Sequence, residues 1–195
     1  MVALLEQTNQ VRRALLLLLG VLGVGMSCFH LITASMGSLP TMEQRSVHLS
    51  FVLGIIFLRS AASRRDAFGL RDFLDCIMAV CGIVIALFAY WNWEELFARV
   101  PFPDDMDLVL GAVLILLVLE GTRRELGNAI PIIAIFFILY ALFGNYIPVR
   151  EIAHRGYSLT RVIANLTMAT EGTRVFYRTA FPDGHGGSGS SRQGV

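Results

Sequence analysis

Histidine and cysteine are the side chains of this sequence best suited to hold a metal ion or to act as a base or nucleophile. The histidines are His30, His48, His154 and His185, and the cysteines are Cys28, Cys76 and Cys81. The cysteines lie inside apolar segments, and no histidine or further cysteine stands at the spacing that a zinc site needs. A phosphate-binding glycine-rich loop and a Gly-x-Ser-x-Gly motif are also absent from the sequence. We therefore predict no catalytic, cofactor-binding or metal-binding residue and no enzymatic activity.

Four ionisable residues inside or beside apolar segments remain as candidates for function: His30, His48, Asp75 and Glu120. An ionisable side chain within a membrane span is a functional suspect by default. For the two histidines we favour a structural interpretation, at the headgroup level or in a hydrogen bond to a neighbouring helix. Asp75 and Glu120 lie at the ends of apolar segments, so we expect both to face water. The sequence identifies no substrate-binding residue.

The elements that carry these residues are long apolar blocks. The chain has 195 residues, of which 55% are hydrophobic and 16% charged, and its mean hydropathy is +0.62. Soluble domains carry about 25% charged residues. The charges gather between the blocks, a layout that a bilayer favours because its core hydrates neither side chains nor backbone. The net charge of +1 gives no case for nucleic-acid binding. We predict an all-α membrane protein embedded in the lipid bilayer.

Five apolar blocks are candidates for four to five membrane-spanning helices. They are Ala14–Ala34, Ser46–Ala62, Leu74–Trp93, Leu108–Leu119 and Ala129–Val149. The first, third and fifth are long enough to cross a hydrocarbon core of about 30 Å. The second block spans only if Arg59 snorkels to the interface and the bilayer thins slightly, and the fourth is short for a span. A signal peptide is the alternative for the first block, but its apolar stretch is too long for one and an uncleaved span is favoured.

Two shorter segments, Met42–Arg45 and Ser158–Met168, are predicted as interfacial helices. In the second, the residues at helical spacing on the apolar face are Leu159, Val162, Ile163 and Leu166, with Arg161 and Asn165 on the other face. An amphipathic helix in the plane of the membrane and a loop helix that packs on the spans fit this pattern equally well.

The placement of arginine predicts the orientation in the membrane. Arg12 and Arg13 precede the first block and the connection Arg59–Arg71 is basic, whereas the connection Glu94–Asp105 is acidic. The positive-inside rule then puts the N-terminus, the basic connection and the Arg123–Arg124 turn in the cytoplasm. Five spans would place an arginine-containing C-terminal part outside. This conflict is resolved if the second or fourth block does not cross fully, or if the C-terminal tail is not in its native context.

Several strings go beyond a general membrane protein. They are residues 108–124 (LVLGAVLILLVLEGTRR), 140–144 (YALFG), 153–159 (AHRGYSL) and 170–172 (TEG). These strings resemble the fused permeases of the tripartite ATP-independent periplasmic (TRAP) transporters, most closely the branch whose binding proteins belong to the TAXI group. The resemblance runs from residue 14 to Gly172 and is densest over residues 106–172.

The resemblance implies a division of the chain and a function. Residues 1–105 correspond to the small membrane subunit of such permeases, and residues 106–172 to the opening of the large subunit. The family imports small organic acids by sodium symport after an extracytoplasmic solute-binding protein has delivered them. The resemblance thus implies a multi-pass protein of the cell inner membrane, with sodium as the coupling ion and no other cofactor.

The sequence departs from the family pattern at Thr173. Residues 173–195 are rich in glycine and serine, and we predict a disordered tail. A frameshift in a GC-rich gene would produce such a tail, which is consistent with the use of arginine for every basic residue; a native linker is the alternative. We therefore expect a non-transporting fragment of a permease. The alternative function is a membrane scaffold or docking protein without transport activity.

Overall fold

The chain folds into helices in the computed structural model. The structure describes residues 2–37, 41–64, 68–99, 102–146 and 155–168, and every regular element in these ranges is helical. The elements are α1 (Val2–Met36), α2 (Thr41–Ser63), α3 (Leu70–Trp91), α4 (Trp93–Ala98), α5 (Asp105–Leu126), α6 (Ala129–Phe143), a 3₁₀ turn (Gly144–Tyr146) and α7 (Leu159–Thr167). The predicted all-α class is confirmed.

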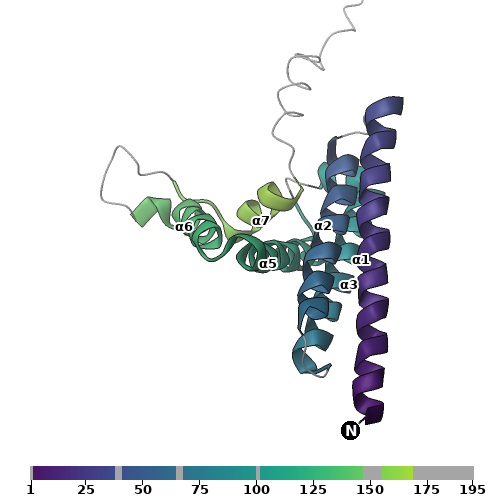
Figure 1. The fold of residues 1–195 in the computed structure, drawn as a ribbon. Coiled ribbons are helices and arrows are strands. Elements are labelled where there is room, and N and C mark those ends of the chain that lie inside the picture. Colours follow the sequence, from purple (N-terminus) through teal and green to yellow (C-terminus); the bar gives the residue numbers. More distant parts are fainter. Residues whose placement is uncertain (1, 38–40, 65–67, 100–101, 147–154, 169–195) are drawn as a thin grey trace, which may run out of the picture.

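Helices α1, α2 and α3 pack side by side as a bundle (Figure 1). Its buried core consists of Leu15, Leu53, Phe57, Leu58, Ala61, Ala62, Ala79 and Ile85, joined by Leu117 from α5. Helices α2 and α3 lie close together at Gly82, where an added Cβ would lie 2.9 Å from the Cβ of Leu53. A larger residue at this position would push the two helices apart, so Gly82 sets their spacing.

Helices α5, α6 and α7 lie to one side of this bundle (Figure 1). Helix α5 contacts α2 and α3 and also packs against α6 and α7. It ends at Leu126 and is followed by the capping residue Gly127, whose φ of +80° is a conformation that glycine adopts without steric cost. Helix α6 begins two residues later, so α5 and α6 form a helical hairpin with a tight connection.

Four helices are long and apolar enough to cross a membrane: Gln10–Met36, Met42–Ser63, Leu70–Trp91 and Ala129–Tyr146. Their outward surfaces are apolar as well. In α6, Pro131 is the buried residue, while Ile132, Phe136 and Phe137 are exposed. Soluble monomers expose only small contiguous apolar patches, so this surface faces lipid. The described residues therefore form a multi-pass membrane protein with four candidate spans.

The two short blocks of the sequence have different outcomes. Helix α2 extends the second block to 23 residues, because Met42–Arg45 belongs to its N-terminal part instead of forming a separate interfacial helix. Helix α5 contains the fourth block, but charged residues flank its apolar part on both sides and it is not among the four candidate spans. The fifth block is described as far as Tyr146, and its last three residues lie outside the described residues.

Helix α7 lies within the segment predicted as an amphipathic helix. The Oγ of Ser158 accepts a hydrogen bond from the backbone N–H of Arg161 and caps its first turn. Residues 162–164 are buried, whereas Leu159 and Leu166 are exposed. The predicted apolar face is thus only half covered, and the helix packs on α5 and α6 as a loop helix does.

The predicted boundary between residues 105 and 106 falls at the first residues of α5. The two regions on either side of it contact each other, because α5 packs on α2 and α3. The division into a small-subunit-like and a large-subunit-like part stays a prediction. The tail predicted over residues 173–195 lies outside the described residues.

Candidate functional site

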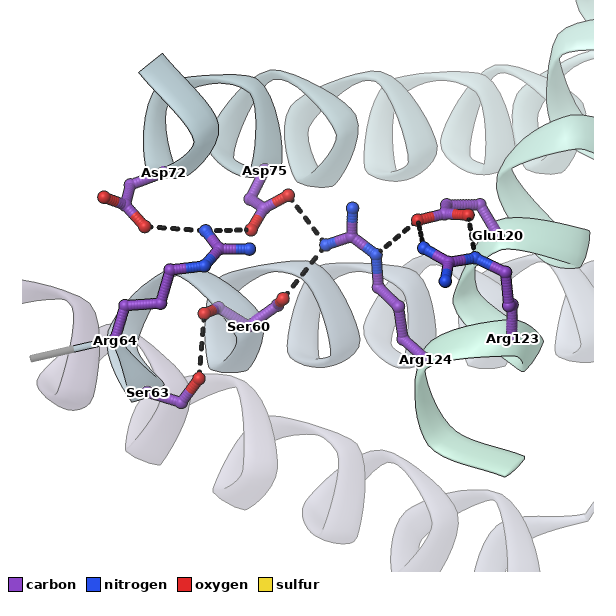
Figure 2. A network of polar contacts seen from close by, with 8 residues as sticks. All are labelled: Ser60, Ser63, Arg64, Asp72, Asp75, Glu120, Arg123 and Arg124. Carbon is purple, nitrogen blue, oxygen red and sulfur yellow. Dashed lines mark hydrogen bonds and ion pairs between the residues drawn. The ribbon is translucent and has the colours of Figure 1, made fainter. Parts of the chain in front are cut away.

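A cluster of ion pairs lies where α2 ends, α3 begins and α5 ends (Figure 2). Its centre is Asp75, which is only 2% exposed. The Oδ1 of Asp75 accepts a hydrogen bond of 2.7 Å from Nη1 of Arg124. Its Oδ2 lies 2.8 Å from Nη1 of Arg64, at ion-pair distance but without hydrogen-bond geometry. These two cations offset the large desolvation penalty of a buried carboxylate.

Arg124 connects three helices at this point (Figure 2). From α5 it donates to Asp75 of α3 and, at 3.0 Å, to the Oγ of Ser60 in α2. Its Nε donates to Glu120 of its own helix at 2.7 Å. The guanidinium also lies over the ring of the fully buried Phe57, 5.0 Å from the ring centroid. Arginine suits this position because it offers several donors in one plane and stacks on aromatic rings.

Arg64 and Asp72 extend the cluster to the first turn of α3. Arg64 donates to Oδ1 of Asp72 at 2.7 Å, and this hydrogen bond raises the pKa of Arg64 above its usual value by stabilising the charged form. The Oδ2 of Asp72 accepts the backbone N–H of Gly69 at 2.9 Å. A carboxylate at this position is favoured by the helix dipole as well. Asp72 therefore fixes both the start of α3 and the side chain of Arg64.

Glu120 and Glu125 are the carboxylates that α5 contributes to the cluster. Glu120 accepts hydrogen bonds from Arg123 and Arg124, each at 2.7 Å. The bond from Arg123 has the largest effect, and together with Arg124 it lowers the pKa of Glu120 to about 2, although partial burial opposes the shift. Arg59 lies 3.1 Å from Glu125, but both side chains are exposed, so this pair contributes little.

The cluster brings two arginine-containing stretches together. The pairs Arg59–Glu125 and Arg124–Asp75 place the end of α5 beside the end of α2. The sequence predicted that the basic connection after α2 and the Arg123–Arg124 turn share one side of the membrane. Their common place at one end of the bundle agrees with that prediction, while the side itself stays a prediction.

Opposite charges are balanced in this cluster, which points to a structural role. The four arginines are Arg59, Arg64, Arg123 and Arg124, and the four carboxylates are Asp72, Asp75, Glu120 and Glu125. Each of the eight has a partner, so none is a free acid, base or nucleophile. Within the described ranges, no group of three His, Cys, Asp or Glu residues is placed to hold a metal ion. What the arrangement can do is tie α5 to α2 and α3.

A smaller ion-pair cluster lies at the other end of α5. The Nε of Arg99 lies 3.1 Å from Oδ2 of Asp107, and its Nη1 lies 3.4 Å from Asp104. Asp107 is 3% exposed and also accepts the backbone N–H of Asp104, which caps α5. All three residues are close in sequence, so this cluster stabilises a local turn.

The structure brings His30 and His48 together, which sequence reasoning did not anticipate. The Nε2 of His30 lies 2.8 Å from the Nδ1 of His48, so α1 and α2 share a hydrogen bond inside their candidate spans. Which ring donates and which accepts depends on their tautomers. This agrees with the favoured interpretation that each histidine bonds a neighbouring helix. The sequence did contain one signal for this contact: the two histidines lie in consecutive apolar blocks, and consecutive spans often pack side by side. His154 and His185 lie outside the described residues.

One expectation about the remaining candidates was wrong. Asp75 does not face water, because the arginines of two other segments cover it. Glu120 is half-buried under Arg123 and Arg124 of its own helix, and its side chain is still 29% exposed. The cysteines are free thiols, and Cys28 and Cys81 lie on the apolar surface instead of in the core.

Comparison with known proteins assigns no family to this chain. No protein-family model, no curated protein and no solved structure matches it. The functional conclusion therefore depends on the sequence strings and on the geometry of the ion-pair cluster.

Proposed function

We propose that this chain is a membrane component of a TRAP-type permease, in which α1–α4 are a platform that holds the first helices of the transport subunit. The observation that supports the proposal is the contact of Arg124 with Asp75 and Ser60. By resemblance, the small-subunit part ends at residue 105 and the transport part begins with α5. The contact joins those two parts.

A platform in lipid needs such a polar connection. Apolar helices gain no hydrophobic energy by associating in a bilayer, because the lipid tails are as apolar as the helices. The Asp75 side chain is 3% exposed and that of Arg124 is 18% exposed. Separating them would leave a charge unpaired in apolar surroundings, which is strongly unfavourable. The pair therefore favours one position of α5 on the bundle.

The proposal includes a location and partners. The end of the bundle that carries Arg59, Arg64 and the Arg123–Arg124 turn lies in the cytoplasm of a cell with an inner membrane, as the positive-inside rule requires. The acidic loop at the other end then faces the extracytoplasmic space, where a solute-binding protein would dock. The complete permease imports small organic acids with sodium.

A membrane scaffold without transport activity is the second candidate. Sodium and carboxylate sites in transporters use broken helices that direct backbone dipoles at the ions. The sequence between Glu120 and Asn128 is the one place that suggests such a break. There α5 ends at Leu126, Gly127 caps it, and α6 begins at Ala129. Both candidates imply that the isolated chain gives no sodium-driven uptake in proteoliposomes. They differ in whether the chain supports transport as part of a permease.

A chimera distinguishes the two candidates. Residues 1–168 would replace the matching N-terminal part of a fused TRAP permease whose substrate is known. Sodium-dependent uptake of that substrate would then be measured in proteoliposomes with its binding protein. We expect uptake above that of empty liposomes, and we expect Arg124→Gln to lower it at least tenfold because α5 loses its attachment. Arg71→Gln, which removes an exposed arginine outside the cluster, is the matched control and should transport normally.

The TRAP assignment fails if the chimera inserts, purifies as a single species and still does not transport. The scaffold candidate would then be preferred. An equal effect of Arg124→Gln and Arg71→Gln would leave the assignment standing but reject the role given to the ion-pair cluster.

A further inference from the structure

A cavity of about 360 Å³ lies between the α2–α3 pair and helices α5, α6 and α7. Its walls are mainly aliphatic, with Leu49, Ala86, Leu114, Val118, Ala134 and Ile138 among them. Polar groups are few and come from Arg45, Ser46 and Thr167. An apolar cavity of this size with a few polar groups has the character of a small-molecule site.

Arg45 is the cation of this cavity. Met42, Arg45, Ser46 and Leu49 recur at helical spacing, so they present one face of α2 to the cavity. Arg45 is the fourth residue of the candidate span that begins at Met42, about 4.5 Å from its end at 1.5 Å per residue. From that depth, the long side chain of Arg45 can extend to the lipid headgroups. Arg45 is exposed, and no described carboxylate lies within ion-pair distance of it.

We propose that this cavity binds a long-chain fatty acid from the membrane, with the acyl chain between the helices and the carboxylate on Arg45. The planar guanidinium matches a carboxylate with two parallel hydrogen bonds. At roughly 30 Å³ for a group the size of a water molecule or a methylene, the cavity holds about a dozen such groups. That number suits most of one acyl chain better than the two chains of a phospholipid.

Other occupants fit the same walls less well. A small polar organic acid would leave the aliphatic walls without contacts. A hydrocarbon without a headgroup would leave Arg45 unpaired. The fatty acid is the ligand that satisfies both the apolar walls and the single cation, and this inference does not depend on the proposed transport function.

The test uses the full chain in phosphatidylcholine vesicles and a palmitic acid that carries a photoactivatable diazirine. We expect saturable crosslinking that maps to the cavity segments of α5 and α6. Arg45→Gln shortens the side chain and removes its charge but keeps one amide donor. It should raise the half-saturating concentration about tenfold, as expected for the loss of one of the two charge-assisted hydrogen bonds. Ala134→Phe fills the cavity from α6 and should remove saturable labelling. Arg71→Gln should change neither value.

Competition identifies the chemistry of the ligand. Unlabelled palmitate should compete with the probe at least tenfold better than hexadecanol, and this preference should disappear in Arg45→Gln. Equal labelling of the wild type and Arg45→Gln would overturn the proposal, as would crosslinks that fall only on the outer surfaces of the helices. Competition by phosphatidylglycerol as strong as that by palmitate would also overturn it in favour of a phospholipid. Because Arg45 is exposed, its variant keeps the test valid if Ala134→Phe does not fold.

Discussion

Two buried aspartates, Asp75 of α3 and Asp107 of α5, occupy similar places and are stabilised in different ways. Each lies in the first two turns of its helix, where the dipole favours a carboxylate, and each is at most 3% exposed. Asp107 pairs with Arg99, eight residues away, and with the backbone of Asp104. Asp75 pairs with Arg124, 49 residues away in another helix. The two aspartates are equally buried, but Asp107 forms a local helix cap and Asp75 forms a contact between two regions.

The two ends of the molecule differ in charge as well as in the range of their contacts. The end around Asp75 has four arginines and four carboxylates in balance. At the other end, Arg99 alone faces Glu95, Asp104 and Asp107. The cluster around Asp75 is thus neutral overall, whereas the ion pairs at the other end leave an excess of negative charge.

The largest expected effect is an all-or-none difference in accessibility between the two ends. Single cysteines would be placed at the exposed positions Arg71 and Asp105 in a chain whose three native cysteines are replaced by alanine. We expect a membrane-impermeant thiol reagent to label Asp105→Cys in intact cells and to label Arg71→Cys only after permeabilisation. The reverse pattern would invert the proposed orientation, and equal labelling would place both ends on one side.

The next effect concerns the stability of the two aspartate sites. Asp75→Asn keeps the shape of the side chain but leaves two arginines without their central anion, so we expect the free energy of unfolding to fall by about 3 kcal/mol. Asp107→Asn removes a charged cap and should lower it by about 1 kcal/mol. Denaturant unfolding in detergent, followed by circular dichroism, measures both.

A double variant tests whether the two charges act together. Asp75→Asn with Arg124→Gln should lower the free energy of unfolding by less than the sum of the two single changes. Equal losses at the two aspartates would remove the distinction between a cap and a tertiary contact.

A smaller difference in stability is expected between alanine substitutions at two glycine contacts, Gly82 between α2 and α3 and Gly111 between α5 and α7. An added Cβ at Gly82 would lie 2.9 Å from the Cβ of Leu53, an atom fixed to the backbone of α2. We expect Gly82→Ala to destabilise the bundle by about 1 kcal/mol, since overpacking exceeds the gain in helix propensity. At Gly111 the Cβ would meet the Cγ2 of Ile163, at 2.8 Å, and Thr167 of the short α7, which is able to shift. Gly111→Ala should leave the unfolding midpoint unchanged and speed proteolysis near α7. A larger loss at Gly111 than at Gly82 would contradict this ranking.

Periodicity and length in the sequence predicted most of the helices, because a bilayer imposes long apolar segments whatever their partners. The length of α2 was underestimated. Met42–Arg45 contains charged residues of the kind that flank a span, so it was assigned to a separate helix. Which charges meet could not be predicted in the same way. Asp75 and Arg124 belong to segments 49 residues apart, and their pairing depends on where α5 crosses the bundle. Nothing in the local pattern around Asp75 differs from that of a carboxylate in water.

The smallest expected effect is the pH dependence of Glu120, at the edge of the Asp75 cluster. Its pKa falls from 4.5 to about 2 in the folded chain because Arg123 and then Arg124 stabilise the carboxylate. A group whose pKa is lowered by folding stabilises the fold above its unfolded pKa, and this contribution is lost as the pH falls from about 4.5 to about 2. Because Arg123 is exposed, we expect less than about 1 kcal/mol. The measurement is the difference in unfolding free energy between the wild type and Glu120→Gln. This difference should become smaller between pH 5 and pH 2, by less than about 1 kcal/mol. Glu94→Gln, which changes an exposed carboxylate beyond the cluster, should show no such trend. A gap between wild type and Glu120→Gln that stays constant with pH would mean that Glu120 acts through its shape and hydrogen bonds alone, and its charge would then have no part in attaching α5 to the bundle.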